Sequence, residues 1–164
     1  MRDGFFGGKD FGGDDFRALM PEYYPSKYRK YIGEETRFLK AALKGSSRVL
    51  EAGVGIGRLI PELAPIVGEL VGVDNSKLML GESREIAENF SNVKIVEGNL
   101  EDLSKIFPAK YFDYSLCIWN TLGNVKNEVL VLKQLAAVTK KSIIVTVYIK
   151  GPLKDRERWY DTVG

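Results

Sequence analysis

The chain has 164 residues, a formal net charge of +2, 45% hydrophobic and 28% charged residues, which is typical of one globular domain with a substantial core. So small a charge gives no bulk electrostatic argument for nucleic acid or an anionic membrane as a partner. A single cysteine excludes an internal disulfide, and with no histidine present we expect no metal site and no Ser-His-Asp or Cys-His nucleophile. No apolar run approaches membrane-spanning length and no signal-peptide core is present, so the sequence predicts a cytoplasmic protein.

The first 45 residues are predicted to form an arm and a helix that cover a site in the domain of residues 46–164, within one compact unit. Residues 1–15 combine paired glycines with phenylalanines, so we expect no regular structure there. This arm is either a loosely docked terminus or a flap whose rings cover the site. A helix is predicted from the N-cap residue Ser26 to Leu43, before a stop at Gly45.

The predicted helix carries one apolar stripe that includes an acid. Its members recur at three- and four-residue spacing: Tyr28, Tyr31, Ile32, Phe38, Leu39, Ala42 and Leu43. Glu35 lies inside the stripe, and we expect Arg37 or a backbone amide to be the partner that a buried carboxylate needs. Tyr28 is our candidate among the tyrosines for contact with a cofactor or an acceptor.

Residues 49–59 read as a buried strand, a glycine-rich turn and the start of a helix. Val49, Leu50 and the small Ala52 suit a parallel strand that is covered on both faces. Glycines then stand at alternate positions, 53, 55 and 57, and let the backbone turn tightly and approach a ligand. Helical periodicity resumes at Leu59, so the pattern predicts a small-molecule site at the carboxyl edge of a sheet.

Strands and helices alternate through the rest of the chain. Strands are predicted at residues 69–74, 93–99, 111–119 and 142–149, and helices at 76–89, at 100–107 and through 130–138. This alternation predicts an α/β fold, a doubly wound, Rossmann-like and mostly parallel sheet with helices on both faces.

The glycine spacing separates the ligands that such a turn can bind. A dinucleotide fingerprint, Gly-x-Gly-x-x-Gly, needs its last glycine where this chain has Arg58 in one register and Ile60 in the other. A phosphate-binding P-loop also fails, because no Gly-Lys-Ser/Thr follows. The spacing therefore disfavours both nucleotide motifs.

The pattern Glu51-x-Gly53-x-Gly55-x-Gly57 resembles the first motif of class I S-adenosylmethionine-dependent methyltransferases, and the resemblance extends over about residues 47–149. It implies that the glycine turn receives the methionyl part of the cofactor, with Glu51 supporting the turn and the ammonium group. Asp74, which ends the second strand, would hold the ribose hydroxyls. Asn99 and the backbone of Leu100 would contact adenine; the family more often has Asp at the Asn99 position.

The resemblance implies a full set of cofactor residues: Glu51, Ala52, Gly53, Val54, Gly55, Gly57, Asp74, Asn75, Asn99, Leu100 and Trp119. Each has a structural alternative. The glycines could be turn formers only, Asp74 could cap the next helix, and Asn99 could simply end a strand. Glu51 could make structural hydrogen bonds alone, and Trp119 could be a core aromatic at the sheet edge.

The acceptor is expected near the exit of the fourth strand, at residues 119–124, with Trp119, Asn120 and Tyr28 as candidate contacts. This segment lacks the Asn/Asp-Pro-Pro-aromatic motif of enzymes that methylate planar amino groups and the Pro-Cys nucleophile of cytosine-C5 enzymes. Its Asn-Thr-Leu-Gly-Asn run is similar to small-molecule methyltransferases of the glycine N-methyltransferase type. Cys117 is expected in the core. The resemblance thus implies transfer of a methyl group to a small molecule or an exposed side chain, with S-adenosylhomocysteine as the product.

Two questions stay open at this point. The family's sheet has two further strands after the fifth, and we expect this chain to lack them. The fifth strand would then be an exposed edge, so either the chain is a truncated form of a longer protein, or another chain, such as a second copy, covers this strand. The function classes that compete with the methyltransferase are a non-catalytic S-adenosylmethionine-binding module or regulatory subunit and, more distantly, an NAD(P)-dependent oxidoreductase.

Overall fold

The structure, a computed structural model, describes residues 26–147, and its centre is a parallel sheet. The strands of this part of the chain run in the order β3-β2-β1-β4-β5. Their bounds are β1 Arg48–Ala52, β2 Glu69–Asp74, β3 Val93–Glu97, β4 Phe112–Cys117 and β5 Thr139–Val145. The strand order reverses between β1 and β4, and the carboxyl ends of strands at such a switch point are where open α/β sheets bind ligands.

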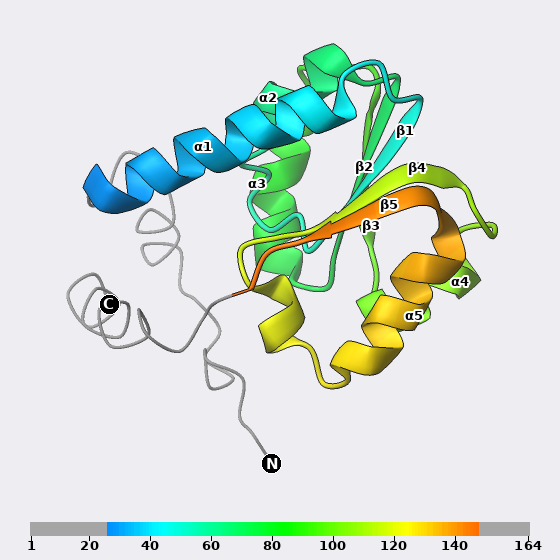
Figure 1. Cartoon of the computed structure of the whole chain (residues 1–164). Helices are drawn as coiled ribbons and strands as arrows, with labels where there is room; N and C mark the ends of the chain where they lie inside the picture. The colour runs from blue at the N-terminus through cyan, green and yellow to red at the C-terminus, as the bar shows by residue number, and fades with distance from the viewer. Residues whose placement is uncertain (1–25, 148–164) are drawn as a thin grey trace.

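Helices cover both faces of the sheet (Figure 1). They are α1 (Ser26–Leu43), α2 (Ile60–Leu63), α3 (Lys77–Ala87), α4 (Leu103–Ile106) and α5 (Glu128–Val138), with short 3-10 helices η3 (Ala64–Ile66), η4 (Leu100–Asp102) and η5 (Thr121–Asn124). The first three α-helices lie on one face, and α4 and α5 lie on the other. The predicted doubly wound, Rossmann-like α/β fold is therefore confirmed.

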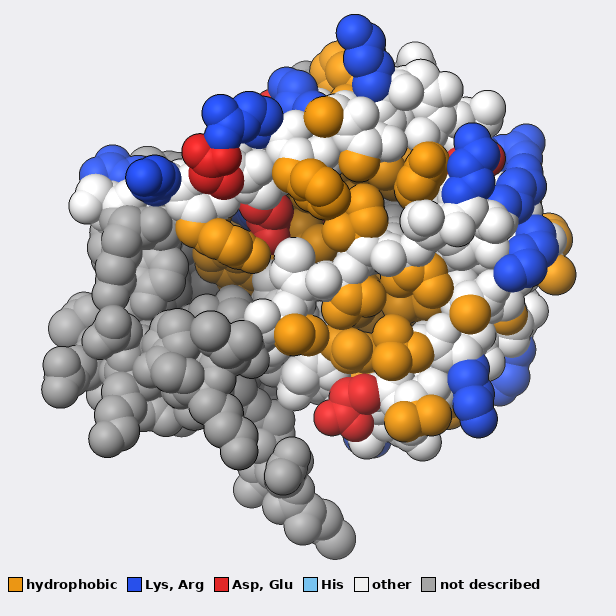
Figure 2. Space-filling view, viewed as in Figure 1, with side chains coloured by type: hydrophobic (Ala, Val, Ile, Leu, Met, Phe, Trp, Pro, Cys, Tyr) orange, Lys and Arg blue, Asp and Glu red, His pale blue; other side chains and the backbone are white. Residues whose placement is uncertain are grey.

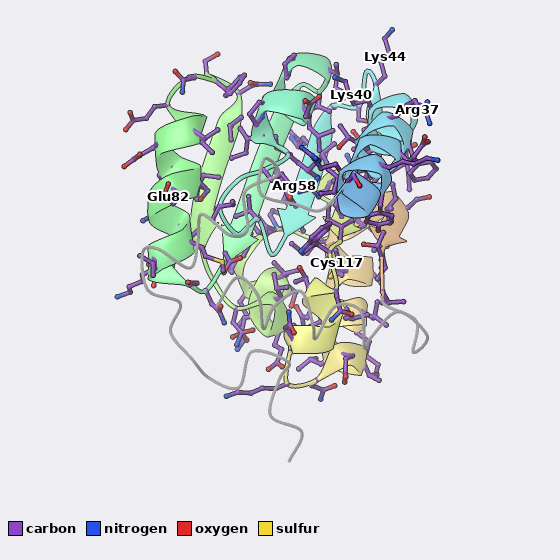
Figure 3. All side chains as sticks on the ribbon, turned by 90° about the vertical axis from the view of Figure 1, so that its left-hand side faces the viewer. Arg37, Lys40, Lys44, Arg58, Glu82 and Cys117 are labelled. Carbon is purple, nitrogen blue, oxygen red and sulfur yellow. The ribbon has the colours of Figure 1, made fainter. Side chains whose placement is uncertain are left out.

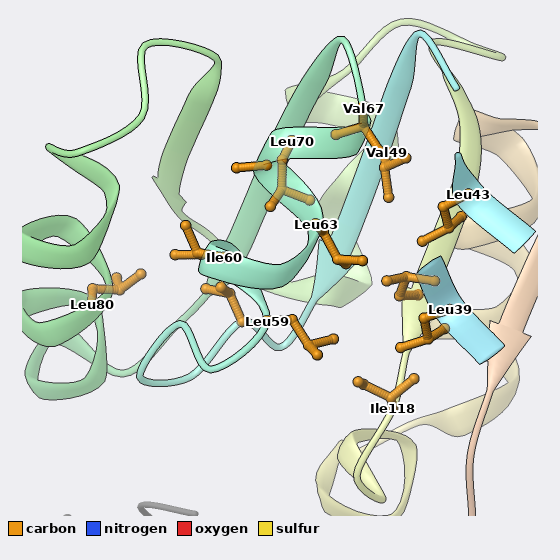
Figure 4. Close-up of a cluster of buried hydrophobic side chains, with 13 residues drawn as sticks. Leu39, Leu43, Val49, Leu59, Ile60, Leu63, Val67, Leu70, Leu80 and Ile118 are labelled. Carbon is orange, nitrogen blue, oxygen red and sulfur yellow. The ribbon is translucent and has the colours of Figure 1, made fainter. Parts of the chain in front are cut away.

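Alternate side chains of the buried strands supply two separate apolar cores. Leu39 and Leu43 of α1 pack with α2 and with Val49 of β1 on one face (Figure 4). On the other face, Leu50 of β1 packs with Leu135 of α5 and with residues of α4. Because each fully buried Leu contributes about 1.5–3 kcal/mol, these two layers hold the helices against the two faces of the sheet.

Several elements differ from their predicted bounds; β4, for example, ends at Cys117 and not at residue 119. The helix after the glycine turn, α2, has only four residues. Pro65 has no N–H to donate, so the α-helical hydrogen bonds stop there and the chain continues as the 3-10 helix η3, although Ala64 before it keeps α-helical φ and ψ of −53° and −40°. The predicted third strand ends at Glu97, and β5 begins at Thr139 rather than Ser142. The early start follows from the Thr139 hydroxyl, which donates to the carbonyl of Leu135 at 2.6 Å and turns the end of α5 directly into the strand.

The predicted apolar stripe of α1 is only partly buried. Ile32, Leu39 and Leu43 are buried, whereas Phe38 is 59% and Tyr31 42% exposed. The helix packs on the sheet through Leu39, Ala42 and Leu43. Figure 2 shows the apolar side chains that remain on the face where α1 and β5 lie.

Candidate functional site

The glycine turn joins β1 to α2 at the carboxyl edge of the sheet. The amides of Gly53 and Val54 both donate to the carbonyl of Val73 in β2, at 2.8 and 3.1 Å, which ties the turn to the neighbouring strand. Gly53, Gly55 and Gly57 all have positive φ, +81°, +54° and +83°. L-residues with a side chain rarely adopt this conformation, so the turn depends on glycine.

Two of these glycines also allow close packing. A methyl group on Gly53 would lie 2.4 Å from Cγ2 of Thr121, in the segment that follows β4. A methyl group on Gly57 would lie 2.7 Å from Ile60 and 3.1 Å from the backbone of Ser83 in α3. Gly53 therefore brings the exit of β4 against the turn, and Gly57 brings α3 against it.

Asp74 ends β2 beside the turn, and both of its carboxylate oxygens are used. Oδ2 accepts from the amide of Gly55 at 2.9 Å, and Oδ1 accepts from the amide of Ser76 at 3.0 Å. The N-cap of α3 is Ser76, whose hydroxyl accepts from the amide of Met79 at 3.4 Å. The alternative in which Asp74 caps that helix is thus wrong, and its carboxylate braces the glycine turn.

Asn99 stands at the end of the next strand. Its side-chain oxygen accepts from the amide of Glu101 at 3.0 Å and caps η4, and its side chain is exposed. The amide of Gly98 donates to the carbonyl of Asp74 at 2.9 Å, so the ends of β2 and β3 lie together. Leu100 is buried and Asn75 is exposed. Their predicted contacts with a ligand stay predictions.

Glu51 is a buried acid within β1. It is 4% exposed, and its Oε2 atom has no hydrogen-bond partner among residues 26–147. Burial raises the pKa of this carboxyl to about 8, because the interior disfavours the charged form; the cation of Arg58 opposes the shift, and the acids Glu35 and Asp74 add to it. An unpartnered buried carboxyl oxygen is costly, which marks a place that a donor from outside would satisfy.

The acid of α1 pairs with a residue of the glycine turn. Glu35 Oε2 lies 2.7 Å from Arg58 Nη2, with side chains 4% and 14% exposed, and Glu35 Oε1 accepts from the Tyr31 hydroxyl at 3.1 Å. The expected partner was wrong, because Arg37 pairs with Glu34 instead. Figure 3 shows Arg58 between α1 and the sheet, and Arg37 on the outer side of the helix.

Arg58 is the residue that the sequence analysis missed as part of the site. Its guanidinium carbon lies 5.3 Å from the ring centroid of Trp119, and the Tyr31 ring is tilted against the same ring, with 6.2 Å between centroids and an interplanar angle of 41°. The signal was present in the sequence: a buried acid in α1 required a cation, and Arg58 directly follows the glycine turn. In the sequence, Arg58 served only as the residue that stands where a dinucleotide motif needs glycine.

The exit of β4 has an unusual backbone. Trp119 and Asn120 are consecutive non-glycine residues with φ of +55° and +61°. Their amides bond to Thr146 after β5: that of Trp119 to the hydroxyl at 2.8 Å, and that of Asn120 to the carbonyl at 3.3 Å. A left-handed conformation costs about 1–2 kcal/mol for a residue such as Trp119, whereas Asn adopts it more readily, so these contacts hold a segment that is strained chiefly at Trp119.

The remaining predictions fall as follows. Cys117 is buried in the core, and burial raises the pKa of its thiol to about 11. Tyr28 belongs to α1, but its side chain is outside what the structure describes, as is the predicted arm of residues 1–15.

Within residues 26–147, no helix is long and apolar enough to cross a membrane, and no group of three or more Cys, Asp or Glu side chains is placed to hold a metal ion.

Comparison with known proteins adds a family to this geometry. Residues 49–142 match the model of a family described as a methyltransferase domain. A demethylmenaquinone methyltransferase of Bacillus licheniformis is 32% identical over 117 residues, which are 70% of this chain and 49% of the relative. Phosphoethanolamine N-methyltransferase 3 of Arabidopsis thaliana is 28% identical over 102 residues, 62% of this chain and 21% of the relative. The chain thus spans half or less of the length of these two relatives.

A solved structure shares the fold over most of its length. The SAM-dependent methyltransferase from Aquifex aeolicus has a TM-score of 0.65 and 18% identity, over 94% of this chain and 89% of that one. At this identity the likeness concerns the fold alone.

Proposed function

The chain belongs to the class I S-adenosylmethionine-dependent methyltransferase family, and on this premise we propose that it transfers the methyl group of S-adenosylmethionine to a small molecule. The observation that carries this proposal is the carboxyl edge of β1 and β2, where a glycine turn, a braced acid and an unpartnered buried acid lie together. The named relatives methylate small molecules, which supports an acceptor of that class.

The residues of this edge fit the cofactor. S-Adenosylmethionine carries an ammonium group, and the Oε2 atom of Glu51 is a buried acceptor that an ammonium would satisfy. Glycine at position 53 leaves backbone uncovered by a side chain, apart from the close approach of Thr121. We propose that Glu51 and the turn of residues 52–57 hold the methionyl part.

Asp74 is proposed to hold the ribose hydroxyls. An ionised carboxylate has about four acceptor positions, and two of them are used by the amides of Gly55 and Ser76. The same group can therefore brace the turn and accept hydroxyl protons. Asn99 and the backbone of Leu100, at the end of β3, are proposed to contact adenine.

Methyl transfer from a sulfonium does not depend on a strong general acid or general base. The cofactor supplies a methyl group on a sulfonium, which is electrophilic without further activation. The protein has to orient the acceptor in line with that methyl group and exclude water, and such positioning accounts for much of the barrier reduction. Trp119, Asn120 and α1 with Tyr28 are proposed to form the acceptor side.

The two other function classes gain no support. The spacing that places Arg58 where a dinucleotide motif needs glycine disfavours an NAD(P)-dependent oxidoreductase. A non-catalytic module that binds the same cofactor would share the site, and only turnover distinguishes it from the enzyme.

Replacement of Asp74 tests the cofactor site. Calorimetric titration of the full chain with S-adenosylhomocysteine should give an affinity at least tenfold weaker for Asp74→Ala than for wild type, because a charged acceptor of two hydroxyls is lost. Glu97→Ala is the matched control, since Glu97 is the register partner of Asp74 at the end of β3 and is half exposed. Equal affinities for the two variants, or a preference of wild type for NAD, would refute the site as proposed.

A methyl-transfer assay tests the enzyme itself. Labelled S-adenosylmethionine is incubated with a panel of small molecules that includes demethylmenaquinone and phosphoethanolamine, the substrates that the relatives' names give. Transfer to any of them that is lost in Asp74→Ala supports the proposal. Tight cofactor binding without transfer to any acceptor would favour the non-catalytic module.

A further inference from the structure

We propose that Thr146 is a positioning residue, whose hydroxyl holds the amide of Trp119 and with it the left-handed conformation of Trp119 and Asn120. The inference rests on the proposed function, because it assigns a role at the acceptor side of the same site. Thr146 lies just beyond β5, and none of the residues expected at the site comes after position 124.

Three hydrogen bonds fix the position of Thr146 relative to the exit of β4. Its own amide donates to the carbonyl of Cys117 at 3.2 Å, its hydroxyl accepts from the amide of Trp119 at 2.8 Å, and its carbonyl accepts from the amide of Asn120 at 3.3 Å. The hydroxyl contact is the shortest of the three. It is made to the first residue of the strained pair, which is where the chain leaves the strand conformation.

The residue that this hydroxyl holds is in contact with α1 and with the glycine turn. The Tyr31 ring of α1 lies tilted against the Trp119 ring, with 6.2 Å between centroids, and the guanidinium carbon of Arg58 lies 5.3 Å from the Trp119 ring centroid. Tyr31 donates to Glu35, and Glu35 pairs with Arg58. The position of the Trp119 amide is therefore coupled, through the Trp119 ring, to the contact between α1 and the glycine turn.

The segment that Thr146 holds is in contact with the glycine turn. Thr121 follows the strained pair and lies where a side chain on Gly53 would be. Its hydroxyl bonds back to the carbonyl of Ile118 at 2.8 Å, and Asn120 packs close to the backbone of Gly123. A change in the conformation of Trp119 and Asn120 therefore moves atoms that touch the turn.

A population argument predicts the effect of removing the hydroxyl. Without it, the strained pair relaxes in part of the molecules, and a ligand that needs the held conformation binds with an affinity reduced by the fraction that retains it. Loss of one hydrogen bond to a partly buried amide corresponds to about a tenfold change in an equilibrium constant.

The test compares Thr146→Val, which keeps the shape of the side chain, with Thr146→Ser, which keeps the hydroxyl. Both are made in full-length chain carrying Trp159→Phe, so that Trp119 is the remaining tryptophan of the sequence. We expect Thr146→Val to weaken binding of S-adenosylhomocysteine by more than twofold and up to about tenfold, and to increase quenching of Trp119 fluorescence by acrylamide. Thr146→Ser should stay within about twofold of the reference chain in both measurements.

Thr139→Val is the matched control for a purely structural effect. Thr139 begins the same strand, its hydroxyl bonds to Ser115 and to the carbonyl of Leu135, both at 2.6 Å, and it lies at the opposite edge of the sheet. Its loss should lower the melting temperature and leave Trp119 fluorescence and ligand affinity unchanged. If Thr146→Val behaves like Thr139→Val, the positioning role is refuted.

The outcomes separate this inference from the proposed function. If the reference chain does not bind S-adenosylhomocysteine, the proposed function fails first, and fluorescence quenching alone then decides whether Thr146 holds the loop. If the reference chain binds and Thr146→Val binds equally, the cofactor site stands and the positioning role is wrong. If Thr146→Val does not fold, hydrogen exchange of the Trp119 amide in wild type decides: exchange as fast as that of exposed Asn124 would overturn the inference.

Discussion

The two edges of the sheet differ in how completely their acids are satisfied. At the amino edge, Asp113 accepts from the amides of Ser47 and Arg48 at 2.9 and 3.1 Å, and Lys141 lies 3.7 Å away. Burial alone would raise the pKa of this carboxyl, but the two amides and the nearby lysines lower it below its usual value.

Glu69 at the same edge is equally well partnered. Its carboxylate contacts Lys94 at 2.6 Å, Arg48 at 3.4 Å and the Tyr111 hydroxyl at 3.2 Å. Hydrogen bonding to Lys94 is the main cause that lowers the pKa of Glu69. The amino edge is thus built from charges that the protein itself satisfies.

At the carboxyl edge the acid of β1 is left unsatisfied. Glu51 keeps one buried oxygen without a partner in the described part of the chain, and the pKa of its carboxyl is raised to about 8. Five of the seven positive φ values among the described residues lie in the same region, at the glycine turn and at the exit of β4; the other two, at Gly45 and Lys110, lie at the amino edge. The amino edge therefore differs from the carboxyl edge chiefly in its acids, because within residues 26–147 only the carboxyl edge keeps an unmet buried acceptor, as expected of a binding site.

The largest effect on ligand affinity and on stability is expected when a methyl group is added at Gly53, where the packing at the carboxyl edge is tightest. Gly53→Ala adds a methyl group 2.4 Å from Thr121 Cγ2 at a position with φ of +81°. We expect S-adenosylhomocysteine binding to weaken about a hundredfold or more and the free energy of unfolding to fall by about 3 kcal/mol. Calorimetry and urea unfolding measure the two quantities.

Gly81→Ala in α3 is the control for that substitution, because a methyl group there meets nothing within 4 Å. It should raise the free energy of unfolding by up to about 1 kcal/mol through helix propensity and leave ligand affinity unchanged. Similar losses of binding in both variants would contradict the role of the close contact.

The second effect is a pH dependence caused by Glu51. Between its unfolded pKa of 4.5 and about 8, the folded state keeps a proton that the unfolded state has lost, so stability should fall as pH rises. The limiting slope is about 1.4 kcal/mol per pH unit, and Glu51→Gln should remove it. Because the chain has no histidine, few other groups titrate between pH 5.5 and 7.5. Urea unfolding of both proteins at these two pH values checks the prediction; parallel behaviour would contradict the raised pKa.

A smaller effect is expected at the amino edge. Asp113→Ala removes the acceptor of two backbone amides and should lower the free energy of unfolding by about 2 kcal/mol at pH 7. Because the folded pKa is lowered, the difference from wild type should shrink as pH falls through that pKa. Affinity for S-adenosylhomocysteine should not change, and any large loss of affinity would break the division between the two edges.

The smallest effect is expected at Cys117. This thiol is fully buried, and burial raises its pKa to about 11, so the reactive thiolate is scarce at pH 8. Native protein should react with iodoacetamide at least about tenfold more slowly than urea-unfolded protein, as measured by mass spectrometry. Rapid labelling of the native chain would show that the β4 strand opens readily.

Local patterns account for what could be predicted. Buried strands and amphipathic helices have their own periods, so the order of elements and the fold class followed from the sequence, and the family followed from Glu51 and its spaced glycines. The bounds of helices and strands were predicted less accurately where one residue changed the local hydrogen bonding. Pro65 shortened α2, and the hydroxyl of Thr139 started β5 early.

Long-range pairs could not be predicted in this way. Glu35 and Arg58 are 23 positions apart, and Trp119 and Thr146 are 27 apart. No local propensity records such separations. Left-handed φ at Trp119 is contrary to the preference of its residue type, and only surrounding contacts explain it.

The sequence by itself determined the α/β fold, the family and the place of the glycine turn, because these depend on residue periodicity and on spacing along the chain. Tertiary structure alone decided that Asp74 braces the turn instead of capping α3. It also decided that Arg58 pairs with Glu35, the buried acid of α1, and that Thr146 bonds to the exit of β4. The physical reason is that polar groups must find partners wherever the interior brings them together, and packing of the whole chain decides which groups meet.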